Sequence, residues 1–403
     1  MDLKSGYPFW AIKNGLMHAF PPLRDSIRSE VVVLGGGITG AVIADHLATH
    51  GHEVVVLEAR DVGWGSTAAS TALLQYELDT HLVDLVRRYG EPAAVQAYHA
   101  CAAAIPRLGE LAREIRDVGF AKQDSLYLAS RPRDLRGMRR EYALRARHGL
   151  PVTWLDTGDI AERYGISAPG GILSSLAARI DPYRMANRLL MRLERQGGRV
   201  FDRTAVTTIE PLDRGVSLRT REGVPVRCRH LVVATGYVAQ TWLPKRLARN
   251  RSSYAFMTDP VEPDGPGILA RTMIWESARP YLYLRSTTDG RLLVGGADDA
   301  ADVPARRDRR VEKKAAALAA QARKLLPEMT FRPAFSWAGT FAETDDGMPF
   351  IGAHPKFGPR VRFALAYGGN GIPFSIVGAD LVMAAIERRA HPLAALMSFE
   401  RLE

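Results

Sequence analysis

Residues 30–40 read EVVVLGGGITG, and they decide the fold of the N-terminal part of the chain. Their β-branched first half is typical of a buried parallel strand. Residues 41–50 follow with apolar side chains at helical spacing, and Gly51 ends this helix as C-terminal glycines commonly do. A second buried strand at 53–57 leads into Glu58. The stretch therefore predicts a strand–helix–strand unit of about 30 residues.

The glycines of this unit have the spacing Gly-x-Gly-x-x-Gly. Gly35 permits the tight turn, Gly37 lets the backbone approach a pyrophosphate, and Gly40 lets helix and strand pack closely. The helix N-terminus then offers free N–H groups and partial positive charge to two phosphates. Glu58, at the end of the second strand, would accept hydrogen bonds from ribose hydroxyls. The pattern predicts a dinucleotide site but does not distinguish NAD from FAD.

A second segment supports this prediction. Residues 231–236 read LVVATG, an apolar strand that ends in a turn of small residues. Ala234, Thr235 and Gly236 would let the backbone pass close to a bound dinucleotide, although an ordinary strand end has the same pattern.

The charge of the chain leaves several kinds of partner open. Its 403 residues carry a formal net charge of +10, which would suit nucleic acid, an anionic membrane or a small anion. The basic residues are scattered, however, with the densest clusters at 131–140, 145–147 and 306–310. We interpret each cluster as a solvated face and expect no nucleic-acid partner.

Cysteine and histidine usage excludes two further classes of site. Cys101 and Cys228 are far apart in the chain, so a disulfide framework is excluded, and no ligand spacing predicts a metal site. The N-terminus lacks the pattern of a signal peptide. No apolar stretch approaches the roughly 20 residues of a membrane span. We expect a soluble, cytoplasmic protein without an integral membrane segment.

The whole set of motifs resembles the D-amino-acid-oxidase-like family of FAD-dependent oxidoreductases, which includes glycine, sarcosine and D-amino-acid oxidases and dehydrogenases. The resemblance covers nearly the whole chain. Its segments, in order, are the fingerprint with Glu58, residues 63–70 (GWGSTAAS), Asp181-Pro182, residues 234–236 (ATG), residues 346–352 (DGMPFIG) and residues 367–371 (YGGNG).

The resemblance and the strand and helix patterns predict an α/β fold. A Rossmann-type FAD-binding domain is interleaved with an α+β substrate domain built on a mainly antiparallel sheet. We assign residues 1–80, 151–240 and 335–403 to the FAD-binding domain. Residues 81–150 and 241–334 are assigned to the substrate domain.

The resemblance also implies the contacts of the cofactor. Ser66, Thr67 and Ser70 are expected along the flavin and its phosphates, and Val206 at the adenine end. Asp346 and the loop from Gly368 to Ile372 are expected beside the isoalloxazine and ribityl chain. The full predicted set is Gly35, Gly37, Ile38, Thr39, Gly40, Glu58, Ala59, Arg60, Gly65, Ser66, Thr67, Ser70, Val206, Ala234, Thr235, Gly236, Asp346, Gly368, Gly369, Asn370, Gly371 and Ile372.

The loop at 368–371 also has a physical interpretation, because it immediately precedes the last predicted helix. A helix N-terminus at the N1–C2=O edge of the flavin would stabilise the anionic reduced form. A flexible glycine turn that only caps the helix is the alternative.

Three positions and one segment depart from patterns of the family. Ala69 stands where some relatives attach the flavin through a histidine, and residues 337–345 lack the cysteine that others use, so we expect non-covalent FAD. Phe341 and Gly369 stand where amino-acid-oxidising relatives place arginines for the substrate carboxylate. Either Arg285 or another arginine replaces them, or the substrate is an amine without an α-carboxylate.

Alternating strands of the second domain supply candidate substrate contacts. Each of them could equally be a core or sheet-face side chain. Glu276 could hold a substrate amine, although a solvated glutamate is the more ordinary interpretation. The candidates are Tyr254, Met257, Trp275, Tyr281, Tyr283 and Phe341.

These features predict oxidation of a small amine or amino acid by hydride transfer to flavin N5. The acceptor that reoxidises the flavin would be oxygen, a quinone or an electron-transfer protein, and no general base is evident. A dehydrogenase of hydroxy acids or polyols on the same fold is one alternative. A non-catalytic accessory flavoprotein is the other, since fold alone does not choose among them.

Overall fold

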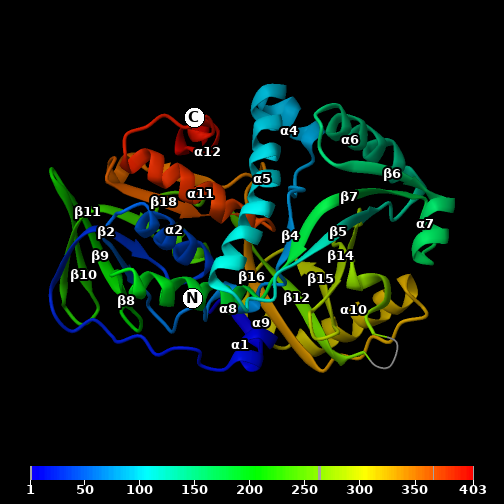
Figure 1. The fold of residues 1–403 in the computed structure, drawn as a ribbon, viewed down its shortest axis with the longest axis horizontal. Helices are drawn as coiled ribbons and strands as arrows, with labels where there is room; N and C mark the ends of the chain where they lie inside the picture. The colour runs from blue at the N-terminus through cyan, green and yellow to red at the C-terminus, as the bar shows by residue number, and fades with distance from the viewer. Residues whose placement is uncertain (1, 262–264, 366, 403) are drawn as a thin grey trace.

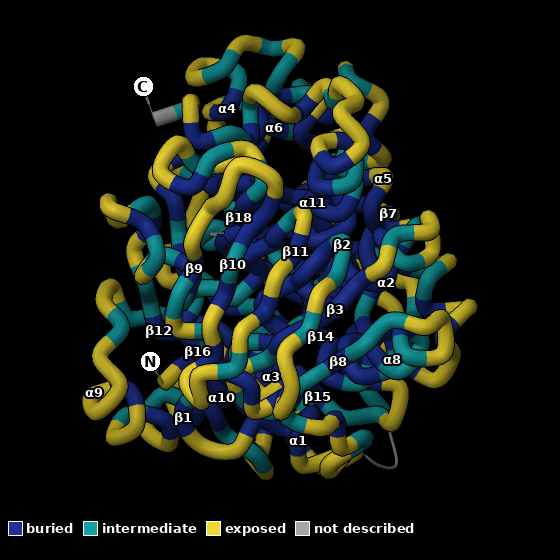
Figure 2. The backbone as a smooth tube through the Cα atoms, turned by 90° about the vertical axis from the view of Figure 1, so that its left-hand side faces the viewer, coloured by how far each residue is buried: buried dark blue, intermediate teal, exposed yellow. Residues whose placement is uncertain are grey.

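The computed structural model describes residues 2–261, 265–365 and 367–402. Its strands form two sheets that lie next to each other, and the long helix α5 (Glu91–Ile115) stands between the two halves (Figure 1). Buried segments gather in the middle of the molecule and exposed segments lie at its rim (Figure 2).

The first sheet has eight strands and contains the predicted strand–helix–strand unit. Its core runs in the order β18-β11-β2-β3-β8 with all neighbours parallel, and β17 adds an antiparallel edge. Strands β2 and β3 pair from Val31 opposite Val54 to Leu34 opposite Leu57. The strands are β2 (Ile27–Leu34), β3 (Val54–Leu57), β8 (Arg199–Phe201), β9 (Val206–Leu212), β10 (Gly215–Thr220), β11 (Pro225–Val233), β17 (Phe350–Ala353) and β18 (Val361–Leu365).

The β-branched runs of this sheet are buried on both faces, as parallel strands require. Val31 and Val33 join the core formed with the helices, while Val32 and Leu34 join a second core on the opposite face. The helices of the first core include α2 (Ile38–Thr49), α5, α8 (Pro182–Arg195) and α11 (Gly371–Ile386).

The second sheet has ten strands in the order β1-β16-β12-β15-β14-β13-β5-β7-β4, with β6 paired to β7. All its pairs are antiparallel except β5 with β13, which confirms the mainly antiparallel sheet. Its strands are β1 (Lys4–Gly6), β4 (Leu73–Gln75), β5 (Ala121–Leu128), β6 (Val152–Asp156), β7 (Gly170–Arg179), β12 (Arg249–Pro260), β13 (Thr272–Glu276), β14 (Leu282–Ser286), β15 (Arg291–Asp299) and β16 (Phe335–Glu343).

Helix α10 covers one face of this second sheet. Its Leu318 and Ala322 pack with Phe256, Leu284 and Val294 in one buried cluster. The remaining α-helices are α1 (Phe9–Asn14), α3 (Ser66–Ala69), α4 (Leu82–Tyr89), α6 (Leu135–Arg147), α7 (Thr157–Tyr164), α9 (Pro304–Asp308), α10 (Val311–Leu325) and α12 (Ala394–Met397).

The division of the strands between the two sheets does not follow the predicted domain ranges. Strands β1, β4, β6, β7 and β16 belong to the ten-stranded sheet, although they lie within the ranges 1–80, 151–240 and 335–403 assigned to the FAD-binding domain. These strands pair with partners distant in the chain, such as β1 with β16 and β5 with β7. Local patterns show that a segment is a strand but not which sheet it joins, which explains the difference.

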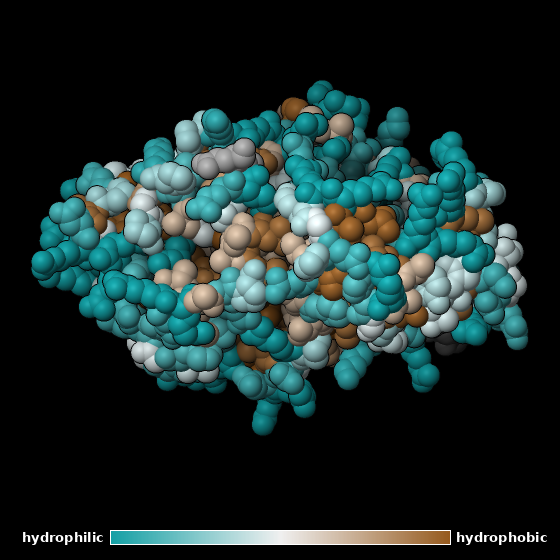
Figure 3. Space-filling view, turned by 90° about the horizontal axis from the view of Figure 1, so that it is seen from above, coloured by the Kyte–Doolittle hydropathy of each residue, from teal (hydrophilic) through white to brown (hydrophobic). Residues whose placement is uncertain are grey.

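Two arginines correct the interpretation of the basic clusters as solvated faces. Arg145 lies fully buried beside Glu141, with 2.7 Å between Nε and the carboxylate. Arg307 is 1% exposed and bonds to groups on three segments. Neighbouring arginines such as Arg306 are exposed, and the face seen from above is mostly hydrophilic at its rim (Figure 3).

Two features of the described ranges concern membranes and metals. No helix within them has both the length and the apolar composition to cross a bilayer. Within the same ranges, no group of three His, Cys, Asp or Glu side chains is placed to hold a metal ion.

Candidate functional site

A cavity of about 510 Å³ extends from the fingerprint turn to the strands of the ten-stranded sheet, within the usual range for ligand sites. The segments that line it come from both sheets, from α3, and from the loop before α11. Nearly all predicted cofactor residues line it: Gly35, Gly37, Ile38, Thr39, Glu58, Ala59, Arg60, Gly65, Ser66, Thr67, Ser70, Val206, Ala234, Thr235, Gly236, Gly368, Gly369, Asn370, Gly371 and Ile372.

The fingerprint turn is built around two close backbone approaches. Gly35 has φ +108°, and a Cβ there would lie 2.4 Å from the carbonyl oxygen of Ala234. A Cβ at Gly40 would lie 1.8 Å from the carbonyl oxygen of Gly35. Gly40 does not itself line the cavity, so its role is to let α2 pack against the turn that does.

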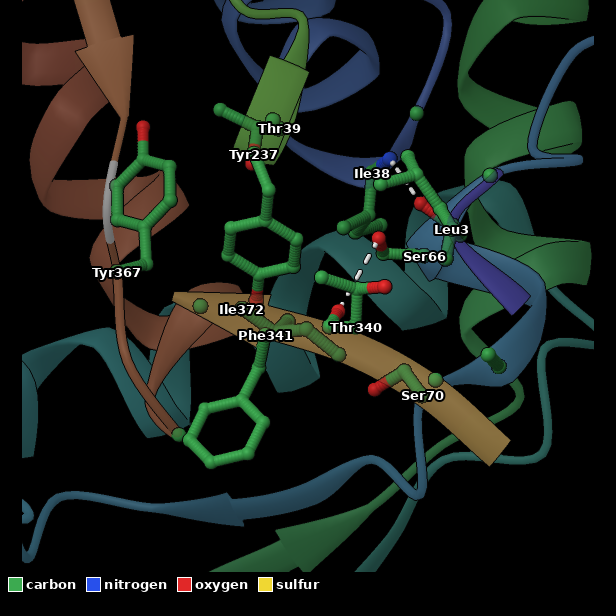
Figure 4. Close-up of a pocket in the computed structure, with 18 of the residues that line it drawn as sticks. Leu3, Ile38, Thr39, Ser66, Ser70, Tyr237, Thr340, Phe341, Tyr367 and Ile372 are labelled. Carbon is green, nitrogen blue, oxygen red and sulfur yellow. Dashed lines mark hydrogen bonds between the residues drawn. The ribbon is translucent and has the colours of Figure 1, made fainter. Parts of the chain in front are cut away.

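The start of α2 is held toward the cavity by a side chain of α3. The backbone N–H of Ile38 donates to Thr67 Oγ1 at 2.9 Å, and Gly37 is the N-cap. Figure 4 shows Ile38, Ser66 and Leu3 together on one side of the pocket. The N-terminus of α2 and helix α3 thus form one wall of the cavity. A helix N-terminus at a cavity wall is a suitable place for an anionic group such as a phosphate.

Glu58 is held in place by backbone groups on both sides. Its Oε2 accepts from the N–H of Gly36 at 2.7 Å, and its Oε1 accepts from the N–H of Arg60 at 2.8 Å. Burial raises the pKa of this carboxyl, and the two hydrogen bonds oppose that shift. A carboxylate fixed in this way, with lone pairs left over, fits a ribose diol.

A buried polar atom beside β11 also fits a bound dinucleotide. Within the described residues, Thr235 Oγ1 is buried and has no hydrogen-bond partner, yet Thr235 lines the cavity. Buried hydroxyls normally have a partner. A ligand in the cavity would provide one.

The other end of the cavity is aromatic. Figure 4 shows the rings of Tyr237, Tyr367 and Phe341 on the side away from Ile38. Trp275 and Tyr283 of the ten-stranded sheet, and Tyr281 directly before β14, line the same cavity, so four predicted substrate contacts, including Phe341, are brought together. Sequence reasoning missed Tyr237, on the 3₁₀ helix η2 (Gly236–Trp242), and Tyr367.

Two of the predicted substrate contacts have other surroundings. Tyr254 contributes to the wall, but its hydroxyl donates to Asp299 at 2.8 Å beside Lys314 of α10. Met257 is fully buried in the cluster that contains Trp337, and it does not line the cavity. Met257 is therefore a core residue and not a pocket residue. Alternation along a strand allows either position, so the sequence alone did not distinguish them.

Asp346 does not line the cavity. Its carboxylate forms an ion pair with Arg401 at 2.8 Å and accepts hydrogen bonds from Tyr89 Oη and from the N–H of Met348. It therefore anchors the turn before β17 to the C-terminal segment, and the structure does not bring it to the cavity with the other predicted cofactor residues.

The expected loop does border the cavity. Helix α11 begins at Gly371, with Asn370 as its N-cap. The Asn370 amide donates to the carbonyl oxygens of Glu77 and Gln75, so it ties the loop to the chain after β4. The positive end of α11 is thereby held at the cavity.

Three acidic residues line the aromatic end and were not predicted: Glu77, Asp79 and Asp298. Residues 73–79 alternate: Leu74, Tyr76 and Leu78 belong to the core, and the odd-numbered residues line the cavity, which Leu78 also borders. That period of two in the sequence was the signal for Glu77 and Asp79. No comparable signal distinguishes Asp298 from its neighbour Asp299.

The candidate replacements for a carboxylate-binding arginine lie elsewhere. Arg285 is 1% exposed and donates to the backbone oxygens of Thr71, Ser286 and Ile180. Glu276, the candidate contact for a substrate amine, also lies outside the cavity. It accepts hydrogen bonds from the Ser130 hydroxyl and from the N–H of Leu282. Among the described residues that line the cavity, Arg60 at the fingerprint end is the only lysine or arginine.

Comparisons with known proteins agree with this geometry. A family model described as FAD dependent oxidoreductase (DAO) matches residues 30–385. Glycine oxidase of Geobacillus kaustophilus (strain HTA426) is 28% identical over 90% of this chain and 94% of that protein. Gamma-glutamylputrescine oxidoreductase of Escherichia coli (strain K12) is 27% identical over 93% of this chain and 87% of that protein.

Solved structures share the fold. The crystal structure of glycine oxidase from Geobacillus kaustophilus superimposes with a TM-score of 0.76 at 24% identity, over 92% of this chain and 98% of that one. The structure of L-proline dehydrogenase from P. horikoshii gives 0.77 at 18% identity, over 94% and 100% of the chains. The predicted α/β fold class is confirmed.

Proposed function

Because the chain belongs to the DAO family of FAD-dependent oxidoreductases, we propose that it oxidises a small amine or amino acid by hydride transfer to FAD. One observation carries this proposal: a single cavity joins the dinucleotide turn to the aromatic end on the ten-stranded sheet. The cofactor and a small substrate can therefore meet in one cavity. The relatives named glycine oxidase and gamma-glutamylputrescine oxidoreductase support amines as the donor class.

FAD, when bound, would supply the acceptor for the hydride and its two electrons. The chain provides the surroundings of the reacting carbon. Trp275, Tyr281, Tyr283 and Phe341 form apolar walls that exclude water and orient a C–H bond. The amine loses that hydride and a proton from nitrogen, and water then hydrolyses the imine to a carbonyl compound and ammonia or an amine.

We propose that the FAD is held without a covalent bond. Ala69 lines the cavity and offers no nucleophile, and both cysteines, Cys101 and Cys228, are buried among core side chains. Acid precipitation tests this directly, since it should release all of the yellow cofactor into the supernatant. Colour that stays with the pellet would contradict it.

An anaerobic spectrum of the purified yellow protein tests the proposed reaction. Amines, N-methyl amino acids, D- and L-amino acids and hydroxy acids are added in turn, and loss of the flavin absorbance is recorded. Bleaching by an amine class supports the proposal, and readmitted air then shows whether oxygen is the acceptor. Bleaching by hydroxy acids alone would favour the polyol or hydroxy-acid alternative, and bleaching by none would favour an accessory role.

Glu58→Ala should weaken FAD binding by about 100-fold. The ribose hydroxyls would lose a charged acceptor, at roughly 1.5–3 kcal/mol, and the N–H groups of Gly36 and Arg60, which shape the turn, lose theirs. Glu53→Ala is the matched control, because Glu53 precedes the same strand but its side chain is 57% exposed. Flavin fluorescence titration measures both affinities, and equal affinities in the two variants would contradict the assigned role.

A further inference from the structure

The aromatic end of the cavity has an unusual charge. Glu77, Asp79 and Asp298 line it, whereas no lysine or arginine among the described residues does so at this end. An α-amino acid bound here would place its carboxylate among carboxylates. A buried charge needs a partner of opposite sign, so this end is unsuited to a carboxylate and suited to a cation.

Asp79 lies directly against the loop that precedes α11. Its Oδ2 accepts from the N–H of Gly369 at 2.7 Å. A Cβ at Gly369 would lie 2.9 Å from Asp79 Oδ1, and one at Gly368 would lie 2.7 Å from Oδ2. An acidic group thus occupies the space into which a side chain at 368 or 369 would project.

Asp298 faces the same space from the end of β15. Within the described residues its Oδ1 is buried without a hydrogen-bond partner. The negative charge of Asp79 contributes to the upward shift of its pKa to about 6, with burial as the larger cause. Burial, and after it the charges of Asp79 and Asp298, raise the pKa of Tyr281, which lines the same cavity as both acids.

Glu77 supplies a second unpartnered oxygen. It is 5% exposed, and its Oε2 has no hydrogen-bond partner among the described residues. Burial raises the pKa of Glu77, and Arg145 of α6, which does not line the cavity, opposes that shift with its positive charge. Asp79 and Asp298 therefore remain the two groups whose charge a ligand would neutralise.

The nearby cations leave room for such a ligand. Arg279 is exposed and stacks over Tyr281, with its guanidinium carbon 4.7 Å from the ring centroid. It attracts Asp79 but does not line the cavity. Lys314 attracts Asp298 from α10, where it already pairs with Asp299 at 3.0 Å, and Glu343 repels both acids.

We propose that the substrate is an aliphatic diamine or polyamine without a carboxylate, and that Asp79 and Asp298 hold the ammonium group that is not oxidised. This proposal rests on the proposed function. The aromatic rings would add cation–π contacts to the same ammonium. The carbon–nitrogen bond at the other end of the alkyl chain then undergoes the oxidation described above.

A matched series of compounds tests the charge at the far end of the substrate. The series is 1,4-diaminobutane, butylamine and 4-aminobutanoate, which end in an ammonium, a methyl and a carboxylate. We expect kcat/KM to fall by at least about tenfold at each step, in that order, which is 1.4 kcal/mol per step. Anaerobic flavin reduction gives the same order independently of the final acceptor.

Asp79→Asn and Asp298→Asn remove the charge and keep the shape. Each should raise KM for 1,4-diaminobutane by at least about tenfold and leave KM for butylamine within a factor of two. Asp259→Asn is the control. Asp259 lies on β12 of the same sheet as Asp298, but its side chain is 79% exposed and does not line the cavity. The flavin spectrum and melting temperature of each variant show that the fold and cofactor are intact.

The outcomes separate this inference from the proposed function. Flavin reduction by glycine or N-methylglycine but not by the diamine would overturn the inference and leave amine oxidation standing. Equal loss of diamine and butylamine activity in the two variants would also overturn it, since the acids would then not recognise the second charge. Failure of every amine to reduce the flavin would overturn both.

Discussion

Gly40→Ala is expected to yield a protein that binds FAD at least about 100-fold more weakly than the natural chain. The added Cβ would lie 1.8 Å from the carbonyl oxygen of Gly35. That atom belongs to the backbone and cannot rotate away, so α2 must move off β2 or the turn must open. Overpacking of this kind costs about 1–3 kcal/mol or more. The turn that should hold the pyrophosphate takes the distortion, and fluorescence titration with FAD measures the loss.

Gly137→Ala is the matched control for this substitution. Gly137 also lies inside a helix, α6, and a Cβ there meets nothing within 4 Å. Alanine is favoured over glycine in a helix by roughly 0.8–1 kcal/mol, so this variant should melt slightly higher with FAD affinity unchanged. Circular dichroism checks that both variants are folded. Retention of normal FAD affinity by Gly40→Ala would contradict the packing role of Gly40.

The part of the site that could be predicted depends on local patterns. The fingerprint glycines and Glu58 follow one another within a single strand–helix–strand unit, and the geometry of such a unit is set by adjacent residues. The same holds for the loop before α11, because a glycine-rich turn and a helix start are neighbours in the chain. Each of these predictions needed only a few residues on either side.

The substrate end depended on contacts between distant segments. Asp79 meets the loop at Gly369, and Asp298 reaches the same space from the end of β15, which local alternation does not reveal. Strand pairing shows the same limit, since β7 joins the ten-stranded sheet by pairing with β5. Local alternation can indicate that a segment is a strand, whereas the sheet that the strand joins follows from the tertiary fold.

Charge clusters show this limit most clearly at Arg307. The run at 306–310 resembles a solvated face, yet the Arg307 side chain is fully buried while Arg306 beside it is exposed. The guanidinium donates to Ser5 Oγ at 2.7 Å, Asp302 Oδ1 at 2.6 Å and Thr340 Oγ1 at 2.7 Å. It therefore joins β1, the segment before α9, and β16 through one side chain.

Arg307→Ala should lower the free energy of unfolding by about 3–5 kcal/mol, since it leaves the buried carboxylate of Asp302 without its counter-charge. Arg306→Ala is the neighbouring control and should change it by less than about 0.5 kcal/mol. Denaturant unfolding measures both. Adding Asp302→Asn to Arg307→Ala should recover part of the loss, because the uncompensated charge is then gone. Equal free energies of unfolding for the two single variants would show that the hydrogen bonds of Arg307 with Ser5, Asp302 and Thr340 do not stabilise the fold.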